Sequence, residues 1–159
     1  MSTIDALVTQ LSVSRGAIHR NLEGVSHEES IRRPDAGNCT NWIVGHIVAS
    51  RSRLLTALGE TGVLPDERIT PYRRGSDGSV EMGLSLQDLV DALDRSQPLL
   101  IARLQRMTEA ELGVKSPISS PAGPDATFGA ALSAMVFHEA YHAGQLGIAR
   151  RLIGKSGAI

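Results

Sequence analysis

Apolar residues recur at three- and four-residue intervals along most of the chain, which is the spacing of amphipathic helices. Four long segments carry this stripe, and it predicts helices over residues 4–25, 42–58, 86–107 and 128–153. The stripe continues in phase through Pro98, so a kink is expected there rather than a helix end. No segment shows the alternation with period two that indicates a strand. The chain is therefore predicted to be all-α.

The connection between the second and third predicted helices is unusually long. Residues 60–83 contain repeated glycine and proline and no sustained hydrophobic period. In an all-helical chain, such a segment is typical of a crossover that runs the length of a bundle. We therefore predict a four-helix bundle with a long crossover between helices two and three, formed by one domain over residues 1–159. Thr40 or Asn41 is expected to cap the second helix, and Gly45 to let a neighbouring element approach it closely.

Composition and charge exclude several classes of protein. The 159 residues carry a formal net charge of −1 and their basic residues form no block, so nucleic acid and anionic membranes are not expected partners. Cys39 is the only cysteine, which excludes an internal disulfide framework, and we interpret it as a small structural residue rather than a reactive thiol. No apolar run approaches the roughly 18 residues of a membrane span, and the first residues lack a leader pattern, which predicts a cytoplasmic protein.

Three of the five histidines lie on the predicted inward faces of two different helices. His138 and His142 are spaced i, i+4 on the apolar side of the last helix, and His46 lies on the apolar stripe of the second. Imidazoles on a buried face are either satisfied by hydrogen bonds or bound to a metal. Two nitrogens from one helix and a third from a packed neighbour would leave a coordination position for water or substrate, as in a catalytic site. His19 and His27 are expected to face solvent.

Three further residues of the last helix are candidates for the same site. Gln145 falls on the histidine face and is expected to orient a ligand or the substrate. Tyr141 lies to one side of that face, where its hydroxyl would reach the rim of a pocket. Glu139 lies about 100° from His138 around the helix and is expected to reach a metal-bound water or a ligand N–H.

The same segment satisfies H-E-x-x-H, the pattern in which glutamate is the general base of a zinc protease. Those proteases take their third ligand downstream, but residues 143–159 contain no His, Asp or Glu. The extended form of the motif fails as well, because Gln145 and Ile148 stand where it requires glycine and histidine. Peptide hydrolysis is therefore the least favoured interpretation.

An aromatic and basic cluster lies within the predicted crossover. Tyr72, Arg73 and Arg74 are consecutive, and together they would be able to cover a pocket and hold an anionic substrate group. The alternative is a solvated loop, because such charges usually face water.

Three runs of sequence together resemble the DinB-like superfamily. They are residues 41–47 (NWIVGHI), 137–146 (FHEAYHAGQL) and 150–154 (RRLIG), and they span nearly the whole chain in order and spacing. The resemblance implies a four-helix bundle that is often homodimeric, with a divalent metal held by His46, His138 and His142. It further implies a metal-dependent enzyme, notably a transferase that activates a low-molecular-weight thiol such as mycothiol, bacillithiol or glutathione.

The leading hypothesis is a metal-dependent enzyme in which zinc or nickel, held by the three histidines, activates a bound water or low-molecular-weight thiol. The reaction would be a thiol S-transfer or a hydrolysis with a small-molecule substrate. The alternative from another class is a non-catalytic dimeric bundle that binds a metal or small ligand in response to stress. A third possibility is that the histidines form a buried hydrogen-bonded cluster without metal.

Overall fold

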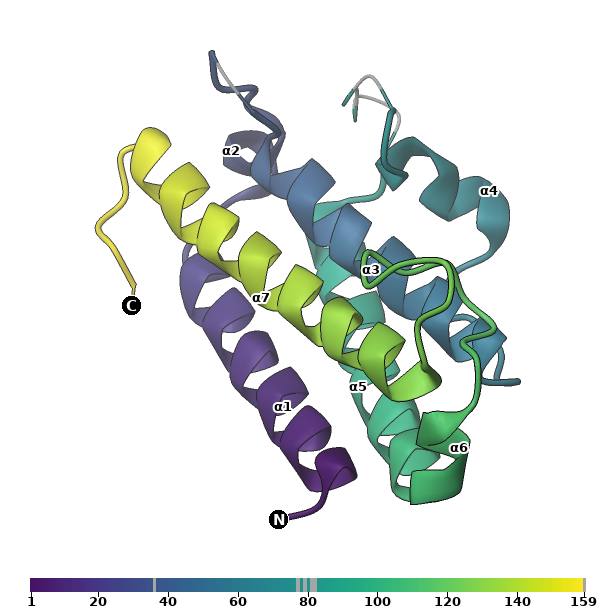
Figure 1. Cartoon of the computed structure of the whole chain (residues 1–159). Coiled ribbons are helices and arrows are strands. Elements are labelled where there is room, and N and C mark those ends of the chain that lie inside the picture. The colour runs from purple at the N-terminus through teal and green to yellow at the C-terminus, as the bar shows by residue number, and fades with distance from the viewer. Residues whose placement is uncertain (36, 77, 79, 81–82, 159) are drawn as a thin grey trace.

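A computed structural model of the chain describes residues 1–35, 37–76, 78, 80 and 83–158, and these residues are all-helical (Figure 1). An isolated antiparallel bridge between Lys115 and Thr127 is the one β-type pairing among them. In chain order the helices are α1 (Thr3–Leu22), α2 (His27–Ile31), α3 (Thr40–Ala57), α4 (Asp66–Ile69), the 3₁₀ turn η1 (Thr70–Tyr72), α5 (Leu86–Gln105), α6 (Glu109–Gly113) and α7 (Phe128–Leu152).

The four predicted helices are present, with shifted ends. α1 stops at Leu22 because the chain turns at Gly24, whose φ of 69° interrupts the helix. α3 begins at Thr40 with Cys39 as its N-cap, so the prediction that Thr40 or Asn41 occupies that position is wrong by one or two residues. α5 continues through Pro98, as the unbroken apolar stripe predicted.

Short helices that begin with a capping box join the long ones. The side chains of Ser26 and Thr108 accept from the backbone N–H three residues later, and the glutamates at those later positions bond back to the capping residues. These contacts start α2 and α6, which precede the loops that lead into α3 and α7. The predicted crossover is not structureless, since it contains α4 and η1.

The long helices pack in a closed circuit, in which α1 contacts α5 and α7, and α3 contacts the same two helices (Figure 1). α3 is the most enclosed of them, because α2, α4 and η1 cover its other side. Every residue from 40 to 49 is consequently buried. Any polar side chain in this stretch therefore needs a partner inside the protein.

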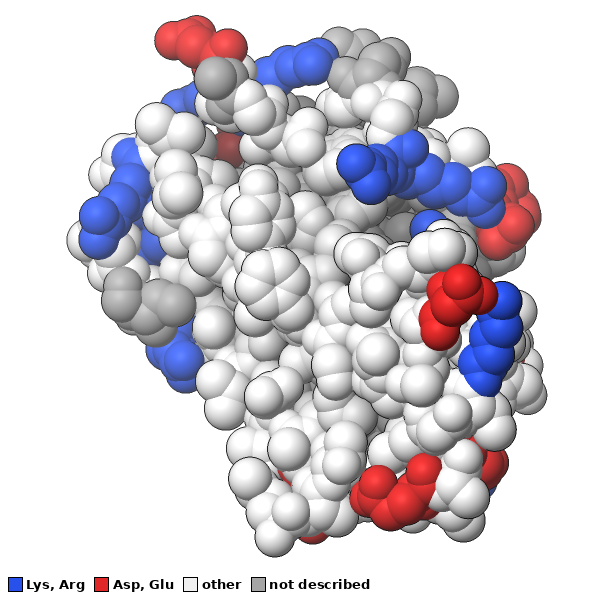
Figure 2. Space-filling model, viewed as in Figure 1, with Lys and Arg blue, Asp and Glu red and all other residues white. Residues whose placement is uncertain are grey.

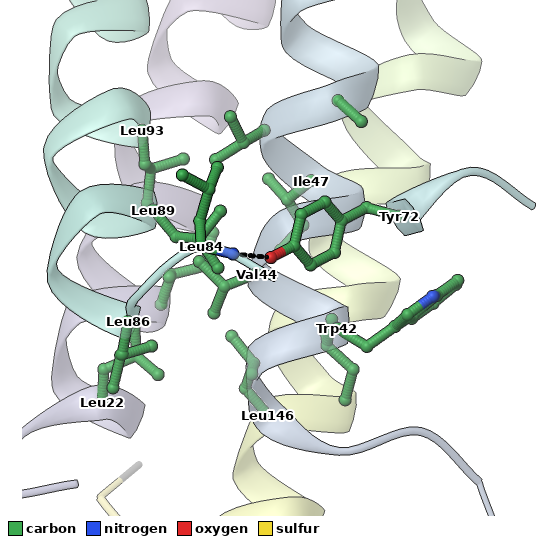
Figure 3. Close-up of a cluster of buried hydrophobic side chains, with 14 of the residues drawn as sticks. Leu22, Trp42, Val44, Ile47, Tyr72, Leu84, Leu86, Leu89, Leu93 and Leu146 are labelled. Carbon is green, nitrogen blue, oxygen red and sulfur yellow. Dashed lines mark hydrogen bonds between the residues drawn. The ribbon is translucent and has the colours of Figure 1, made fainter. Parts of the chain in front are cut away.

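One of the two hydrophobic clusters surrounds the N-terminal half of α3 and includes Tyr72 of η1 (Figure 3). The tyrosine ring lies directly against Gly45, which has no side chain to keep it away. Its hydroxyl accepts from the Leu84 backbone N–H at 2.7 Å and donates to Asn41 Oδ1 at 3.3 Å. The close approach predicted at Gly45 is therefore present, and the neighbour is η1.

No helix in the described part of the chain combines the length and the hydropathy needed to cross a membrane.

Candidate metal centre

Three imidazoles from two helices meet between α3 and α7. His138 Nε2 lies 3.1 Å from His46 Nε2 and 3.1 Å from His142 Nε2. The nitrogens available as ligands in this group all lie within 4.8 Å of one another. His46 and His142 are buried, and His138 is partly exposed. The structure thus brings together the three histidines that the sequence placed on inward faces.

Hydrogen bonds at the far side of two rings set their tautomers. His46 Nδ1 lies 2.7 Å from the Tyr72 carbonyl oxygen, which only accepts, so Nδ1 carries the proton. His142 Nδ1 lies 2.7 Å from Gln145 Oε1, and the amide nitrogen of Gln145 donates to the Tyr141 hydroxyl at 3.1 Å, so this Nδ1 is protonated as well. Both Nε2 atoms therefore present lone pairs to the centre of the cluster. His138 Nδ1 has no hydrogen-bond partner among the described residues.

The spacing of the nitrogens suits a metal ion. Zinc–nitrogen bonds are about 2.05 Å long, and a 3.1 Å separation of two ligands then corresponds to an N–metal–N angle of about 98°. This value lies between the octahedral angle of about 90° and the tetrahedral angle of about 109°. Two of the three nitrogens are already deprotonated, and His138 needs only to hold its proton on Nδ1. The two 3.1 Å nitrogen pairs, which share His138, therefore fit neighbouring positions on a divalent metal.

The electrostatic environment keeps these imidazoles neutral. Burial is the main cause that lowers the pKa of His46, His138 and His142, and for His138 it combines with the other two imidazoles to bring the pKa from 6.5 to about 4. The positive charges of Arg53 and Arg74 add to the lowering at His46 and His138. Neutral imidazoles at physiological pH are the form that binds metal.

Packing holds the ring of His46 in place. The Trp42 indole, one helical turn earlier on α3, stacks on this ring with centroids 4.7 Å apart and an interplanar angle of 8°. The carbonyl that binds Nδ1 belongs to Tyr72, whose own position depends on the contact with Gly45. His46 is therefore oriented by α3 on one side and by η1 on the other.

Gln145 contacts the cluster through its amide oxygen, and its partner is the His142 ring. Gln145 was expected to orient a ligand or the substrate, and in the structure its amide oxygen accepts from His142 Nδ1 at 2.7 Å. Tyr141 lies beside it with more than half of its surface exposed, and its ring meets the His142 ring edge to face at 5.2 Å. These two residues extend the cluster from the buried His142 toward solvent.

Glu139 differs from the prediction. Its two carboxylate oxygens accept from Arg51 Nε at 2.6 Å and from Arg51 Nη2 at 2.7 Å, and both side chains are almost completely buried. Arg51 Nη1 also donates to Ser96 Oγ and to the Leu93 carbonyl, which ties α3 to α5 as well as α7. A buried arginine requires such a counter-charge, so Glu139 is held in the ion pair and is not directed at the histidines.

Tyr72 also differs from the prediction, because its side chain is completely buried and lies in the core instead of over a pocket. Arg73 is partly exposed and pairs with Asp66 at 3.1 Å, and Arg74 is exposed.

The two other histidines lie outside the cluster. His27 is exposed as predicted, whereas His19 is half-buried and binds Asp94 at 2.8 Å.

Sequence reasoning missed two contributors to the site. Arg51 carries no motif, and its position on α3 next to inward-facing residues was the one signal available. The Tyr72 carbonyl is a main-chain atom, so the side chain at that position gave no information about it.

Comparison with known proteins identifies the family of this chain. The profile of the DinB superfamily matches residues 10–146, and the chain therefore belongs to that superfamily. Among solved structures, a crystal structure of "the conserved protein of locus from Enterococcus faecalis" matches with a TM-score of 0.77, covering 96% of this chain and 98% of that one. Its sequence identity of 18% means that the likeness shows the fold alone. No curated protein sequence matches significantly.

Proposed function

We propose that this chain is a metal-dependent enzyme in which His46, His138 and His142 hold a divalent metal, with zinc and nickel as the leading candidates. The observation that carries the proposal is that His138 Nε2 lies 3.1 Å from both His46 Nε2 and His142 Nε2, and that outer hydrogen bonds set the inward lone pairs of His46 and His142. We interpret the long helices as a four-helix bundle, with residues 60–83 as the crossover, formed by one domain over the whole chain.

The donor set favours an anionic ligand at the centre. Three neutral imidazoles do not offset the charge of a divalent ion, and Arg53 and Arg74 add positive charge nearby. When bound, the metal supplies Lewis acidity, which makes a water molecule or a low-molecular-weight thiol nucleophilic near neutral pH. Three protein ligands leave room for such a molecule. We therefore assign the reaction class as thiol S-transfer or hydrolysis of a small-molecule substrate.

The residues around the histidines divide the remaining tasks. Tyr72, through its carbonyl, and Gln145, through its amide oxygen, hold protons on the outer ring nitrogens and so keep the inner lone pairs available. The Tyr141 hydroxyl lies at the exposed rim, where it is placed to donate to a substrate atom. His138 is the partly exposed ring of the three, so we propose that substrate approaches the metal from its side.

Peptide hydrolysis of the H-E-x-x-H type is disfavoured by one contact. That mechanism needs a glutamate free to take a proton from water, and both oxygens of Glu139 are engaged by Arg51. Freeing the carboxylate would leave Arg51 unpaired in the core.

The exposed face of α7 supports a dimer. Phe137, Tyr141, Ile148 and Leu152 are all more than half exposed and follow one another at intervals of four, seven and four residues. Figure 2 shows a broad surface without charged side chains over the region that α7 occupies in Figure 1. An uncharged face of this kind is typical of a protein interface. We propose a homodimer formed through α7.

A dimer through α7 is also compatible with the second candidate function, a non-catalytic bundle that binds a metal or small ligand. A ligand position occupied by water in the metal-loaded protein would support the enzyme, whereas a fully protein-ligated ion would support the binding protein.

Metal analysis tests the proposal directly. Protein purified without chelator should carry about one divalent metal per chain, and His142→Ala should carry little, while His19→Ala, outside the cluster, should match the wild type. Circular dichroism of each variant checks that it folds. Equal metal content in wild type and His142→Ala would overturn the proposal. With cobalt as the metal, titration with candidate thiols should release protons and change the visible spectrum if the reaction is thiol transfer, and a silent spectrum would favour hydrolysis.

A further inference from the structure

A groove lined by arginines lies between the C-terminal half of α3 and the segment that contains α4. Its volume is about 1030 Å³, and its lining includes Arg53, Arg73 and Arg74 with Asp66 as the one acidic residue. Figure 2 shows Lys and Arg side chains gathered beside a hollow in the region that α3 and α4 occupy in Figure 1. The groove is therefore large enough for a small organic molecule, and its charge is positive.

The arginines of this groove are not neutralised within the protein. Arg53 and Arg74 are exposed and have no ion-pair partner among the described residues. Arg73 pairs with Asp66 through Nη2, but its Nε is buried and finds no acceptor in the described part of the chain. Two guanidinium groups without an ion-pair partner and one buried unpaired N–H donor line the same groove, and together they favour the binding of an anion.

The groove adjoins the histidines through both of the elements that form it. Arg73 and Arg74 directly follow Tyr72, whose carbonyl binds His46 Nδ1 at 2.7 Å. Arg53 comes seven residues after His46 on α3, which places it on the same helix face about 10 Å along the axis. A molecule of ordinary metabolite size is able to span that distance.

We propose that this groove binds the oxyanion group of the small-molecule substrate, with Arg53 and Arg74 as the binding residues. Guanidinium groups prefer planar or tetrahedral oxyanions, so the group is a carboxylate or a phosphate. Leu64 and Ile69 line the same groove and provide an apolar wall for the organic part of the molecule. The inference rests on the proposed function, because it names the substrate class of that metal site. The inference also revises the substrate-binding cluster predicted from the sequence, Tyr72, Arg73 and Arg74. Arg53 now replaces Tyr72, whose side chain is buried in the core.

Anion binding to metal-free protein tests the groove without the metal. Chelator-treated wild type is titrated by calorimetry at low ionic strength with inorganic phosphate and, separately, with succinate. At least one probe should bind, and the Arg53→Gln/Arg74→Gln double variant should bind it about tenfold more weakly. Arg95→Gln, which removes an exposed arginine of α5 outside the groove, should bind as the wild type does. Preference for phosphate identifies a phosphate ester as the substrate class, and preference for succinate identifies an organic acid.

Two results would overturn the inference: binding of neither probe to the wild type, or equal binding to the wild type and the double variant. Metal content is then measured on the same proteins after reloading. Metal binding without anion binding would refute the anion site and leave the proposed metal-dependent function standing. Anion binding without metal binding would refute the proposed function and leave the groove as an anion site. The double variant should retain the wild-type metal content, since neither arginine contacts an imidazole.

Discussion

Substitution of Gly45 by alanine should weaken both the fold and the metal site. An added Cβ would lie 2.5 Å from Cγ of the Tyr72 ring and closer still to Cδ1 and Cε1, so the ring would have to move by more than about 1 Å. Overpacking of this kind costs about 1–3 kcal/mol, and displacement of the tyrosine hydroxyl from the Leu84 N–H leaves a buried donor unpaired at about 1–3 kcal/mol. Alanine recovers about 1 kcal/mol of helix propensity. The expected net loss is about 3 kcal/mol.

Displacement of the Tyr72 ring should also disturb the hydrogen bonding of the histidine cluster. The carbonyl of Tyr72 moves with its ring, so the hydrogen bond to His46 Nδ1 is lengthened or lost. Loss of such an outer contact typically lowers metal affinity about 10- to 100-fold. Urea unfolding of metal-free protein measures the first effect, and competition with a chromophoric chelator measures the second.

Gly144→Ala is the matched control, because Gly144 lies within α7 and an added Cβ would meet nothing within 4 Å. This variant should be as stable as the wild type or about 1 kcal/mol more stable. If Gly45→Ala behaved in the same way, with unchanged metal affinity, the argument that the Tyr72 ring positions His46 would be refuted.

Three further results are expected. Metal-free protein should lose about 1–2 kcal/mol of stability as pH falls from 6.5 to about 4, because His138 takes up its proton at a higher pH in the unfolded chain than in the folded protein. This value is lower than the full pKa shift would give, because His138 is partly exposed and solvent screens its charge. The loss should be smaller in His138→Asn, and equal pH profiles of urea unfolding for the two proteins would contradict this. Arg51→Met should cost about 3–5 kcal/mol by leaving Glu139 buried without its partner, and Arg51→Met/Glu139→Leu should recover most of that loss in urea unfolding. Phe137→Glu should turn a dimer into a monomer by light scattering with metal content unchanged, and a monomeric wild type would refute the proposed α7 interface.

Much of the helical organisation follows from local pattern. Burial of one face forces apolar side chains into a 3.6-residue period, and that period located all four long helices to within a few residues. The same period placed His46, His138 and His142 on inward faces, and inward histidines on packed helices come close together. These parts were predictable because each depends on the spacing of residues within a single helix.

The parts that were not predictable depend on contacts between distant segments. Glu139 had the spacing of a catalytic base, yet its partner is set by which residue of α3 faces it, and Arg51 lies 88 positions earlier in the chain. The neighbouring arginines led to the prediction that Tyr72 lies in a polar loop. In the structure its ring is in the core, because Gly45 has no side chain and leaves space for it. Local composition describes a loop, but tertiary contact decides which of its side chains are buried.

The two outer hydrogen bonds of the histidine cluster differ in how evolution is able to adjust them. Gln145 contacts His142 through a side chain, so a single codon change replaces the amide with a carboxylate or an apolar group and alters the basicity of the ligand. The partner of His46 is a peptide oxygen, which every residue type supplies, so a substitution at position 72 is able to shift this oxygen but not to change its chemistry. Substitution of one residue is therefore able to change the basicity of His142, whereas the hydrogen bond to His46 depends on the path of the main chain.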